Sequence, residues 1–187
     1  MSSANDLGSP RRLALAVHPL VRFVLVRPHY PENLGAAARA LKTMGFSDLG
    51  LVRPGRLCTR EHEMAFKMAV KSWDVLAAAR VFDSVEAACD GASFVVATTA
   101  RRGMSGVYTP RALAPEIVRR AERGQRATIL FGNEKTGLSE DEHATASAQL
   151  RIPMAADQPS INLAQAVQLV SYELLLAALD ARDGSAP

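Results

Sequence analysis

Short apolar runs alternate along the chain with segments whose apolar residues recur at helical spacing. The strand-like runs cover 21–26, 49–52, 93–97, 127–131 and 149–152. The helical patterns cover 34–44, 61–79, 85–89, 110–123, a short segment after Ser139, and 160–182. Strands that are apolar throughout and alternate with helices are typical of a mostly parallel sheet with helices on both faces. We therefore predict one α/β domain over residues 21–182, with a flexible N-terminal arm, 1–20, and a flexible tail, 183–187.

Polar residues and glycine at the ends of these segments predict where the helices begin and stop. Asn33 and Ser160 can each cap the helix that follows, because their side-chain oxygens can accept a free backbone N–H. Gly45 suits the left-handed position after a helix. Ser139 followed by Glu142 has the spacing of a capping box.

Four loops with unusual polar residues each follow a strand-like run and precede a helical pattern. They are 27–33, 98–102, 132–137 and 157–162. In an open α/β sheet, ligands bind in the crevice beyond the carboxyl ends of the strands. Loops at that edge lie close in space although they are far apart in sequence, so we predict one composite site.

Composition narrows the possible functions. The 187 residues suit one domain, and 48% hydrophobic with 22% charged residues is typical of a globular protein. Only 5% are aromatic, which disfavours a platform that stacks single-stranded bases, while the net charge of +3 permits an anionic partner. No apolar run approaches the roughly 20 residues that span a bilayer, so no membrane association is expected. The two cysteines, Cys58 and Cys89, lack CxxC spacing, so a reducing, cytoplasmic setting is expected.

The first loop leads into a helix that could bind an anion. Small residues at 35–38 would let a phosphate approach the helix N-terminus, where free N–H groups favour negative charge. Arg39, less than two turns further on, could reach the same anion. The same residues also suit a capped helix with an alanine-rich packing face and a solvated arginine.

The other loops exclude some chemistries. Gly132 to Gly137 lacks the GxxxxGK[ST] order of a phosphate loop, and no GxGxxG follows the first strand. A tight turn would explain the glycines but not the position of Glu134 at the sheet edge. Asn162 brings an amide to the same edge. The histidines show no metal-ligand spacing, so no metal is assigned, and His29 suits a surface histidine better than a general base. The sequence has no GxSxG motif, so acyl transfer is not indicated.

Three motifs together resemble a known family. Asn33-x-Gly35-x-x-x-Arg39, then Phe131-Gly132-Asn133-Glu134-x-x-Gly137-Leu138, then Ser160-x-Asn162-Leu163-Ala164 are similar to the ordered motifs of SPOUT RNA methyltransferases of the TrmH type. The sequences of residues 38–45 and 95–101 most resemble those of the TrmJ branch. The resemblance covers about residues 21–180. It implies a trefoil knot in the C-terminal part of the sheet and a homodimer in which Arg39 reaches the cofactor held by the other subunit.

The resemblance also implies an activity and a set of residues. The activity is methyl transfer from S-adenosylmethionine to a ribose 2′-hydroxyl of RNA, in the anticodon loop of tRNA. Arg39 would be catalytic, and Asn33, Glu134, Ser160 and Asn162 would orient ribose, arginine and cofactor. The residues implied to hold the cofactor are Thr98, Thr99, Ala100, Leu130, Gly132, Asn133, Gly137, Ile152, Pro153, Met154, Pro159, Ser160, Ile161 and Leu163.

Alternatives to this function stay open. TrmJ-like enzymes carry a C-terminal extension that assists tRNA binding, whereas this sequence stops just after its last helix, so the substrate is not determined. Ribosomal RNA or another position in tRNA is the alternative among enzymes. A non-catalytic RNA-binding protein that keeps the fold as a platform is the alternative outside them.

Overall fold

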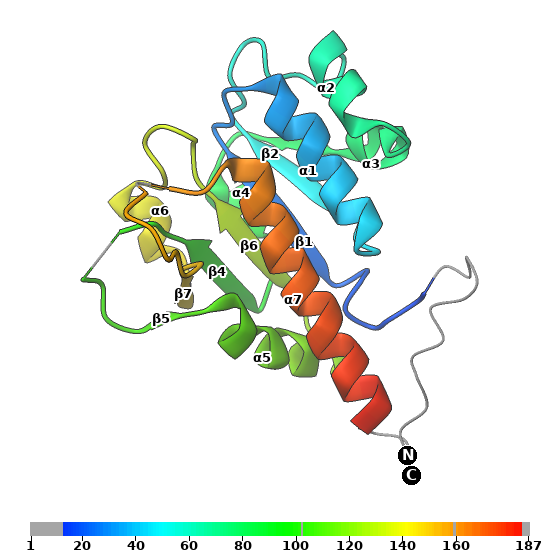
Figure 1. The fold of residues 1–187 in the computed structure, drawn as a ribbon, viewed down its shortest axis with the longest axis vertical. Helices are drawn as coiled ribbons and strands as arrows, with labels where there is room; N and C mark the ends of the chain where they lie inside the picture. The colour runs from blue at the N-terminus through cyan, green and yellow to red at the C-terminus, as the bar shows by residue number, and fades with distance from the viewer. Residues whose placement is uncertain (1–12, 102, 159, 185–187) are drawn as a thin grey trace.

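The chain forms one parallel sheet with helices on both faces, as a computed structural model shows for residues 13–101, 103–158 and 160–184 (Figure 1). The strands are β1 Val21–Val26, β2 Leu49–Val52, β3 Arg80–Phe82, β4 Phe94–Thr98, β5 Val107–Tyr108, β6 Ala127–Phe131 and β7 Ala148–Leu150. Their order in the sheet is β3-β2-β1-β6-β4-β7-β5, and each pair is parallel. The predicted α/β class is confirmed. The trefoil knot stays a prediction, because strand order and pairing do not describe how one segment threads another.

The helices divide unequally between the two faces. Helices α1 Pro31–Thr43, α5 Pro110–Glu122 and α7 Leu163–Gly184 cover one face, where α7 packs against both α1 and α5 (Figure 1). Two short helices, α2 Glu63–Ala69 and α3 Trp73–Ala78, pack on α1. Helices α4 Val85–Cys89 and α6 Glu140–Ala144 lie on the opposite face (Figure 1).

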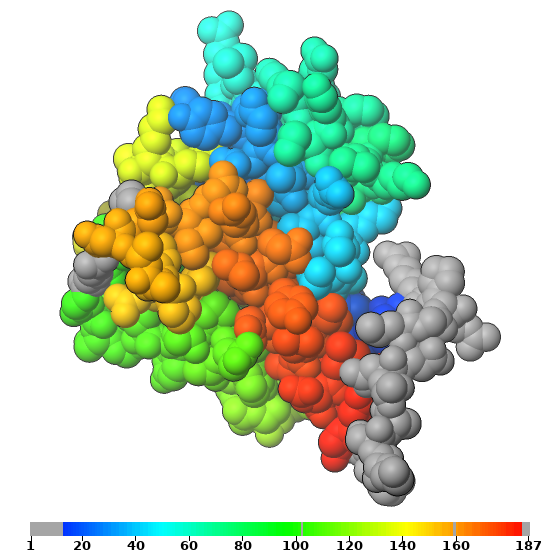
Figure 2. Space-filling view, in the orientation of Figure 1, coloured from blue at the N-terminus to red at the C-terminus, as the bar shows by residue number. Residues whose placement is uncertain are grey.

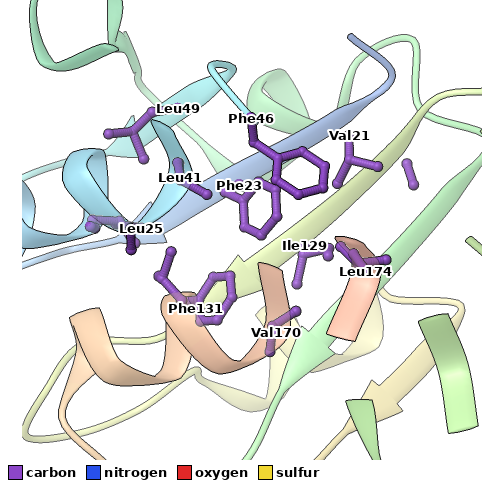
Figure 3. Packing of buried hydrophobic residues seen from close by; sticks show 14 of the residues in the cluster. Val21, Phe23, Leu25, Leu41, Phe46, Leu49, Ile129, Phe131, Val170 and Leu174 are labelled. Atoms are coloured by element: carbon purple, nitrogen blue, oxygen red, sulfur yellow. The ribbon is translucent and has the colours of Figure 1, made fainter. Parts of the chain in front are cut away.

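Side chains of each central strand alternate between two hydrophobic layers. In β1, Phe23 and Leu25 enter the larger layer, while Val24 and Val26 enter the smaller one. In the larger layer the ring of Phe23 contacts that of Phe46 at a centroid distance of 5.1 Å and packs beside Phe131 (Figure 3). Because both faces of the sheet are covered, most positions of the central strands are apolar, with Arg22 in β1 and Thr128 in β6 as buried exceptions.

Two of the four predicted helix boundaries are confirmed. Ser139 and Glu142 form the capping box of α6. Gly45 follows α1 with φ of 89°, and the amide of Phe46 donates to Leu41 O at 2.9 Å, which closes a Schellman motif.

The two predicted caps next to the site are wrong. Helix α1 begins at Pro31, whose fixed φ suits the first turn, so Asn33 lies inside the helix. Helix α7 begins at Leu163, and Asn162 instead of Ser160 caps it by accepting the amides of Ala164 and Gln165.

The predicted helix 61–79 is also wrong, because it consists of α2 and α3 separated by a turn. Val70 in that turn has φ of 51°, which no helix permits, and the turn brings the rings of Phe66 and Trp73 into a parallel stack 4.9 Å apart. Strands β3 and β5 were not predicted, because they are only three and two residues long and partly exposed.

Part of the predicted N-terminal arm packs on the domain. Residues 1–12 of the predicted arm and residues 185–187 of the predicted tail lie outside the described residues. Residues 13–20 are described, and Val17 among them belongs to the hydrophobic core.

Among the described residues, α7 meets the length and composition of a membrane-spanning helix. It packs against α1 and α5, and a helix in a protein core meets the same criterion. This feature is therefore weak support for a membrane span.

The contact between α1 and α2 gives a stability prediction. A Cβ on Gly35 would lie 2.0 Å from the backbone oxygen of Ala65, so Gly35→Ala should lower the free energy of unfolding by about 1–3 kcal/mol. At an uncrowded helical site the same change stabilises by roughly 0.5–1 kcal/mol. Gly184→Ala, at the end of α7 with no atom within 4 Å, is the matched control. Urea denaturation measures both, and a stabilised Gly35→Ala variant would show that α2 does not pack this closely.

Candidate functional site

The carboxylate of Glu134 joins the loop after β6 to the start of α1. Its Oε2 accepts the backbone amide of His29 at 2.9 Å, and its Oε1 accepts the amide of Tyr30 at 3.3 Å and Asn33 Nδ2 at 2.9 Å. Tyr30 precedes α1 but makes no side-chain capping bond. Glu134 therefore satisfies the free donors around this helix N-terminus from another part of the chain, where a negative charge also interacts favourably with the helix dipole.

A second hydrogen bond extends this connection to α7. The side-chain oxygen of Asn33 accepts Asn162 Nδ2 at 2.9 Å, while the oxygen of Asn162 caps α7. Asn33 is only 8% exposed, and its two bonds satisfy a polar group that would be costly to bury alone. We call Glu134, Asn33 and Asn162 the amide–carboxylate chain. Three of the five predicted catalytic residues are thus linked through Asn33, by two contacts that each join residues more than 100 positions apart.

The loop that carries Glu134 is closed by its own hydrogen bonds. The side-chain oxygen of Asn133 accepts the amides of Lys135 and Thr136, and the backbones of Asn133 and Gly137 pair with each other. A Cβ on Gly132 would lie 2.3 Å from Gly137 C, so the loop folds back too tightly for any side chain there. The segment from Gly132 to Gly137 is therefore a tight turn, and the shape of this turn directs Glu134 toward α1.

Two arginines anchor this loop from neighbouring strands. Arg27, just after β1, binds the carboxylate of Glu142 in α6 and Gly137 O. Arg101, after β4, binds the carboxylate of Glu140 and Leu138 O. The loop and α6 are therefore held from both sides.

A cavity of about 280 Å³ lies beside this loop, at the carboxyl ends of β4, β6 and β7. Its lining comes from residues 98–101, 131–138, 143, 150, 152, 154, 160, 161, 163 and 166. Figure 2 shows two of these segments, 132–138 in yellow and 150–166 in amber and orange, side by side on one face. Three of the four loops predicted to form one composite site supply residues of this concavity, whereas the loop 27–33 does not line it and contacts Glu134 instead.

Most of the residues predicted to hold a cofactor line this cavity. They are Thr98, Thr99, Ala100, Gly132, Asn133, Gly137, Ile152, Met154, Ser160, Ile161 and Leu163, together with the predicted catalytic Glu134. Leu130 does not line it, because its side chain is fully buried in the smaller hydrophobic layer. Pro153 is not among the lining residues, and Pro159 lies outside the described residues.

Sequence reasoning missed part of the lining. The missed residues are Arg101, Phe131, Lys135, Thr136, Leu138, His143, Leu150 and Ala166. Most of them stand next to a predicted residue in the sequence, so a prediction that also included the neighbours of each motif would contain them. His143 is different, because it is a buried residue of α6 whose ring nitrogen pairs with Gln149 at 2.7 Å, and no sequence pattern marks it.

Arg39 is separate from this cavity within one chain. It is exposed on α1 and does not line the cavity. Among the described residues, no carboxylate forms an ion pair with its guanidinium. The guanidinium of Arg39 is therefore exposed, and no carboxylate of the described residues neutralises it.

Cys58, whose thiol is affected by the charge of Glu134, is not an activated nucleophile. Burial, reinforced by the charges of Glu134 and Glu32, raises the pKa of the Cys58 thiol to about 12, so it is not a thiolate nucleophile at neutral pH. Within the described ranges, no three histidine, cysteine, aspartate or glutamate side chains are grouped to hold a metal ion.

Comparison with known proteins gives relatives over most of the chain. It is 39% identical over 161 residues to an uncharacterized tRNA/rRNA methyltransferase of Haemophilus influenzae, covering 85% of this chain and 64% of that protein. It is 38% identical over 164 residues to a tRNA (cytidine/uridine/adenosine-2′-O-)-methyltransferase, TrmJ, of Pseudomonas aeruginosa, covering 87% of this chain and 63% of that protein. The chain thus spans slightly less than two thirds of either relative.

Solved structures agree with the fold. A probable methyltransferase from Bordetella pertussis superposes with a TM-score of 0.80 at 33% identity, covering 87% of this chain and 96% of that one. The model of the SpoU rRNA methylase family matches residues 20–172, a range that includes the whole amide–carboxylate chain and the cavity. The chain belongs to the SpoU rRNA methylase family.

Proposed function

We propose that this protein transfers a methyl group from S-adenosylmethionine to a ribose 2′-hydroxyl of RNA, in the anticodon loop of tRNA. The observation that carries the proposal is the amide–carboxylate chain beside the cavity, since it joins all three motifs at one site. The relative from Pseudomonas aeruginosa, a tRNA 2′-O-methyltransferase, supports the reaction and the substrate class. We place the activity in the cytoplasm, where both substrates occur.

The cavity suits a nucleoside-containing cofactor. Its volume of about 280 Å³ is close to the lower end of the roughly 300–1,000 Å³ usual for ligand pockets. Leu138, Leu150, Ile152 and Met154 give it an apolar wall for a purine ring. Gly132 and the backbone of 98–100 offer polar groups at its edge. When bound, the cofactor supplies an electrophilic methyl group on a positively charged sulfur.

Glu134 and Asn33 act as positioning residues. The carboxylate of Glu134 already accepts three donors, and Asn33 uses both ends of its amide. Neither is free to take the proton of a ribose hydroxyl. Their role is to hold the starts of α1 and α7 against the loop that lines the cavity. Methyl transfer needs mainly such alignment, for which intramolecular positioning is effective.

Arg39 is the residue we assign to contact RNA at the reacting centre. Its guanidinium stays protonated, so it anchors a phosphate and stabilises the developing alkoxide rather than acting as a base. It is exposed and away from the cavity of its own chain. We therefore propose that the protein is a homodimer in which Arg39 serves the cavity of the partner subunit.

Calorimetry with S-adenosylmethionine separates this enzyme from a non-catalytic RNA-binding platform. We expect a binding isotherm with one site per chain. Incubation with labelled cofactor and total RNA, followed by mass spectrometry, should then locate the methyl group on a ribose of the tRNA anticodon loop. A methyl group on ribosomal RNA would redirect the substrate assignment, and the absence of binding heat would contradict the enzyme assignment.

Arg39→Ala should keep cofactor binding and reduce methyl transfer by about 10²-fold or more. Arg123→Ala, which removes another exposed arginine without an ion pair among the described residues, is the matched control and should retain activity. Wild-type turnover by Arg39→Ala would remove Arg39 from the mechanism.

A mixed dimer tests whether Arg39 acts across the subunit interface. One subunit carries Arg39→Ala, and the other carries Ile161→Trp, which fills its cavity. If Arg39 acts across the interface, one complete site remains and about half the activity is expected. If it acts within its own chain, both sites are defective and the mixed dimer is inactive.

Glu134→Gln should lower the free energy of unfolding by about 1.5–3 kcal/mol, because hydrogen bonds to a charged group are lost and an amide replaces one acceptor. Glu140→Gln is the control, since the carboxylate of Glu140 is 80% exposed and its pair with Arg101 contributes at most about 1 kcal/mol. Chemical denaturation measures both. If both variants lost the same free energy of unfolding, Glu134 would not be the residue that holds the site together.

A further inference from the structure

An exposed aromatic side chain with a cation over it lies beside the cavity. Tyr30 is 42% exposed, and Lys135 Nζ lies 5.6 Å from the centre of its ring. The ring of His29 meets that of Tyr30 edge-on, 4.8 Å away. Lys135 also lines the cavity, so this cluster adjoins the site.

The backbone that carries the Tyr30 ring is held in place. The amides of His29 and Tyr30 both donate to Glu134, and prolines at 28 and 31 restrict the chain on either side. The neighbouring loop after β2 also docks here, since Gly55 N donates to Pro28 O at 2.9 Å. A single exposed tyrosine is ordinary. Here the hydrogen bonds to Glu134, the two prolines and the docked loop all hold the backbone of Tyr30, so less conformational entropy is lost when a ligand binds to its ring.

An aromatic ring beside a mobile ammonium group matches one nucleotide. The base can stack on the ring, and the ammonium can pair with the adjoining phosphate. Lys135 has a flexible stem, so a base can displace it from the ring while its charge moves to the phosphate. Arg56 directly follows Gly55 in the docked loop, and within the described residues it has no ion pair, so it offers a second phosphate contact.

We propose that Tyr30 and Lys135 form a subsite that stacks one unpaired nucleobase of the RNA substrate at the mouth of the cavity. The inference rests on the proposed function for the identity of the ligand as RNA. Bases within a duplex have both faces covered, so the subsite selects nucleotides in loops or bulges. A single ring is also compatible with the low aromatic content of the chain, which disfavours an extended stacking groove but not one position.

The test measures fluorescence anisotropy of two labelled RNAs with the full chain. One is a stem-loop, and the other is a blunt duplex of the same stem sequence. Tyr30→Ala should weaken binding of the stem-loop by about tenfold and leave duplex binding within twofold. Tyr30→Phe should bind the stem-loop within twofold of wild type, because the ring is kept. Lys135→Ala should weaken binding and reduce its dependence on salt, since one phosphate contact is lost.

Tyr108→Ala is the matched control for removal of an exposed tyrosine. Strand β5, which carries Tyr108, lies at the far edge of the sheet and is separated from β1 by β6, β4 and β7. This variant should bind both RNAs as wild type does. Thermal unfolding and calorimetry with S-adenosylmethionine check that Tyr30→Ala is folded with an intact cavity.

Three outcomes would overturn the stacking subsite. Tyr30→Ala could bind the stem-loop as tightly as wild type does, or it could lose as much affinity for the duplex as for the stem-loop. The third is a loss of stem-loop affinity in Tyr30→Phe as large as that in Tyr30→Ala. These outcomes are independent of catalysis. Methyl transfer with wild-type stem-loop affinity in Tyr30→Ala would refute the subsite alone. Absence of cofactor binding, with loop-specific binding that depends on Tyr30, would refute the proposed reaction and support the subsite.

Discussion

One carboxylate organises this site, because Glu134 accepts hydrogen bonds from two backbone amides before α1 and from the side chain of Asn33. Helix α1 has no side-chain cap of its own, and the amides of the two residues just before it need an acceptor from elsewhere. That acceptor comes from a loop 100 residues later, and Asn33 passes the connection on to Asn162 at the start of α7. Three elements remote in sequence therefore share one hydrogen-bonded junction, and the cavity lies next to it.

The junction requires that the Glu134 loop keep one shape. Asn133 closes the turn with its side chain, and Gly132 permits a backbone approach that no side chain would allow. Arg27 and Arg101 then hold the loop and α6 from the strands on either side. Glu134, Asn33 and Asn162 are thus engaged in hydrogen bonds that hold these elements together, whereas Arg39 is exposed and forms no ion pair within the described part of the chain.

The site and the fold were predictable to different extents. The parallel α/β sheet follows from apolar runs that only strands covered on both faces produce, and 11 of the 14 predicted cofactor-holding positions line the cavity. That Asn33 and Ser160 do not cap these helices was not predictable, because a local rule assigns an asparagine or serine to the nearest helix start. Pro31 moved the start of α1, Asn33 bonds to Asn162, and Asn162 rather than Ser160 caps α7. The break at Val70 was missed because helical periodicity continues across it.

The sequence alone determined the order of the longer strands and of most helices, the polar loops that follow the strands, and the family resemblance, because hydrophobic patterning and turn chemistry can be read locally along the chain. Only the tertiary structure decided which polar groups pair with which. Glu134 meets His29 and Tyr30 because β1 and β6 are neighbours in the sheet, and no pattern within either segment encodes that neighbour. The same pairing places Lys135 over Tyr30, so the proposed nucleobase subsite is a property of the folded chain.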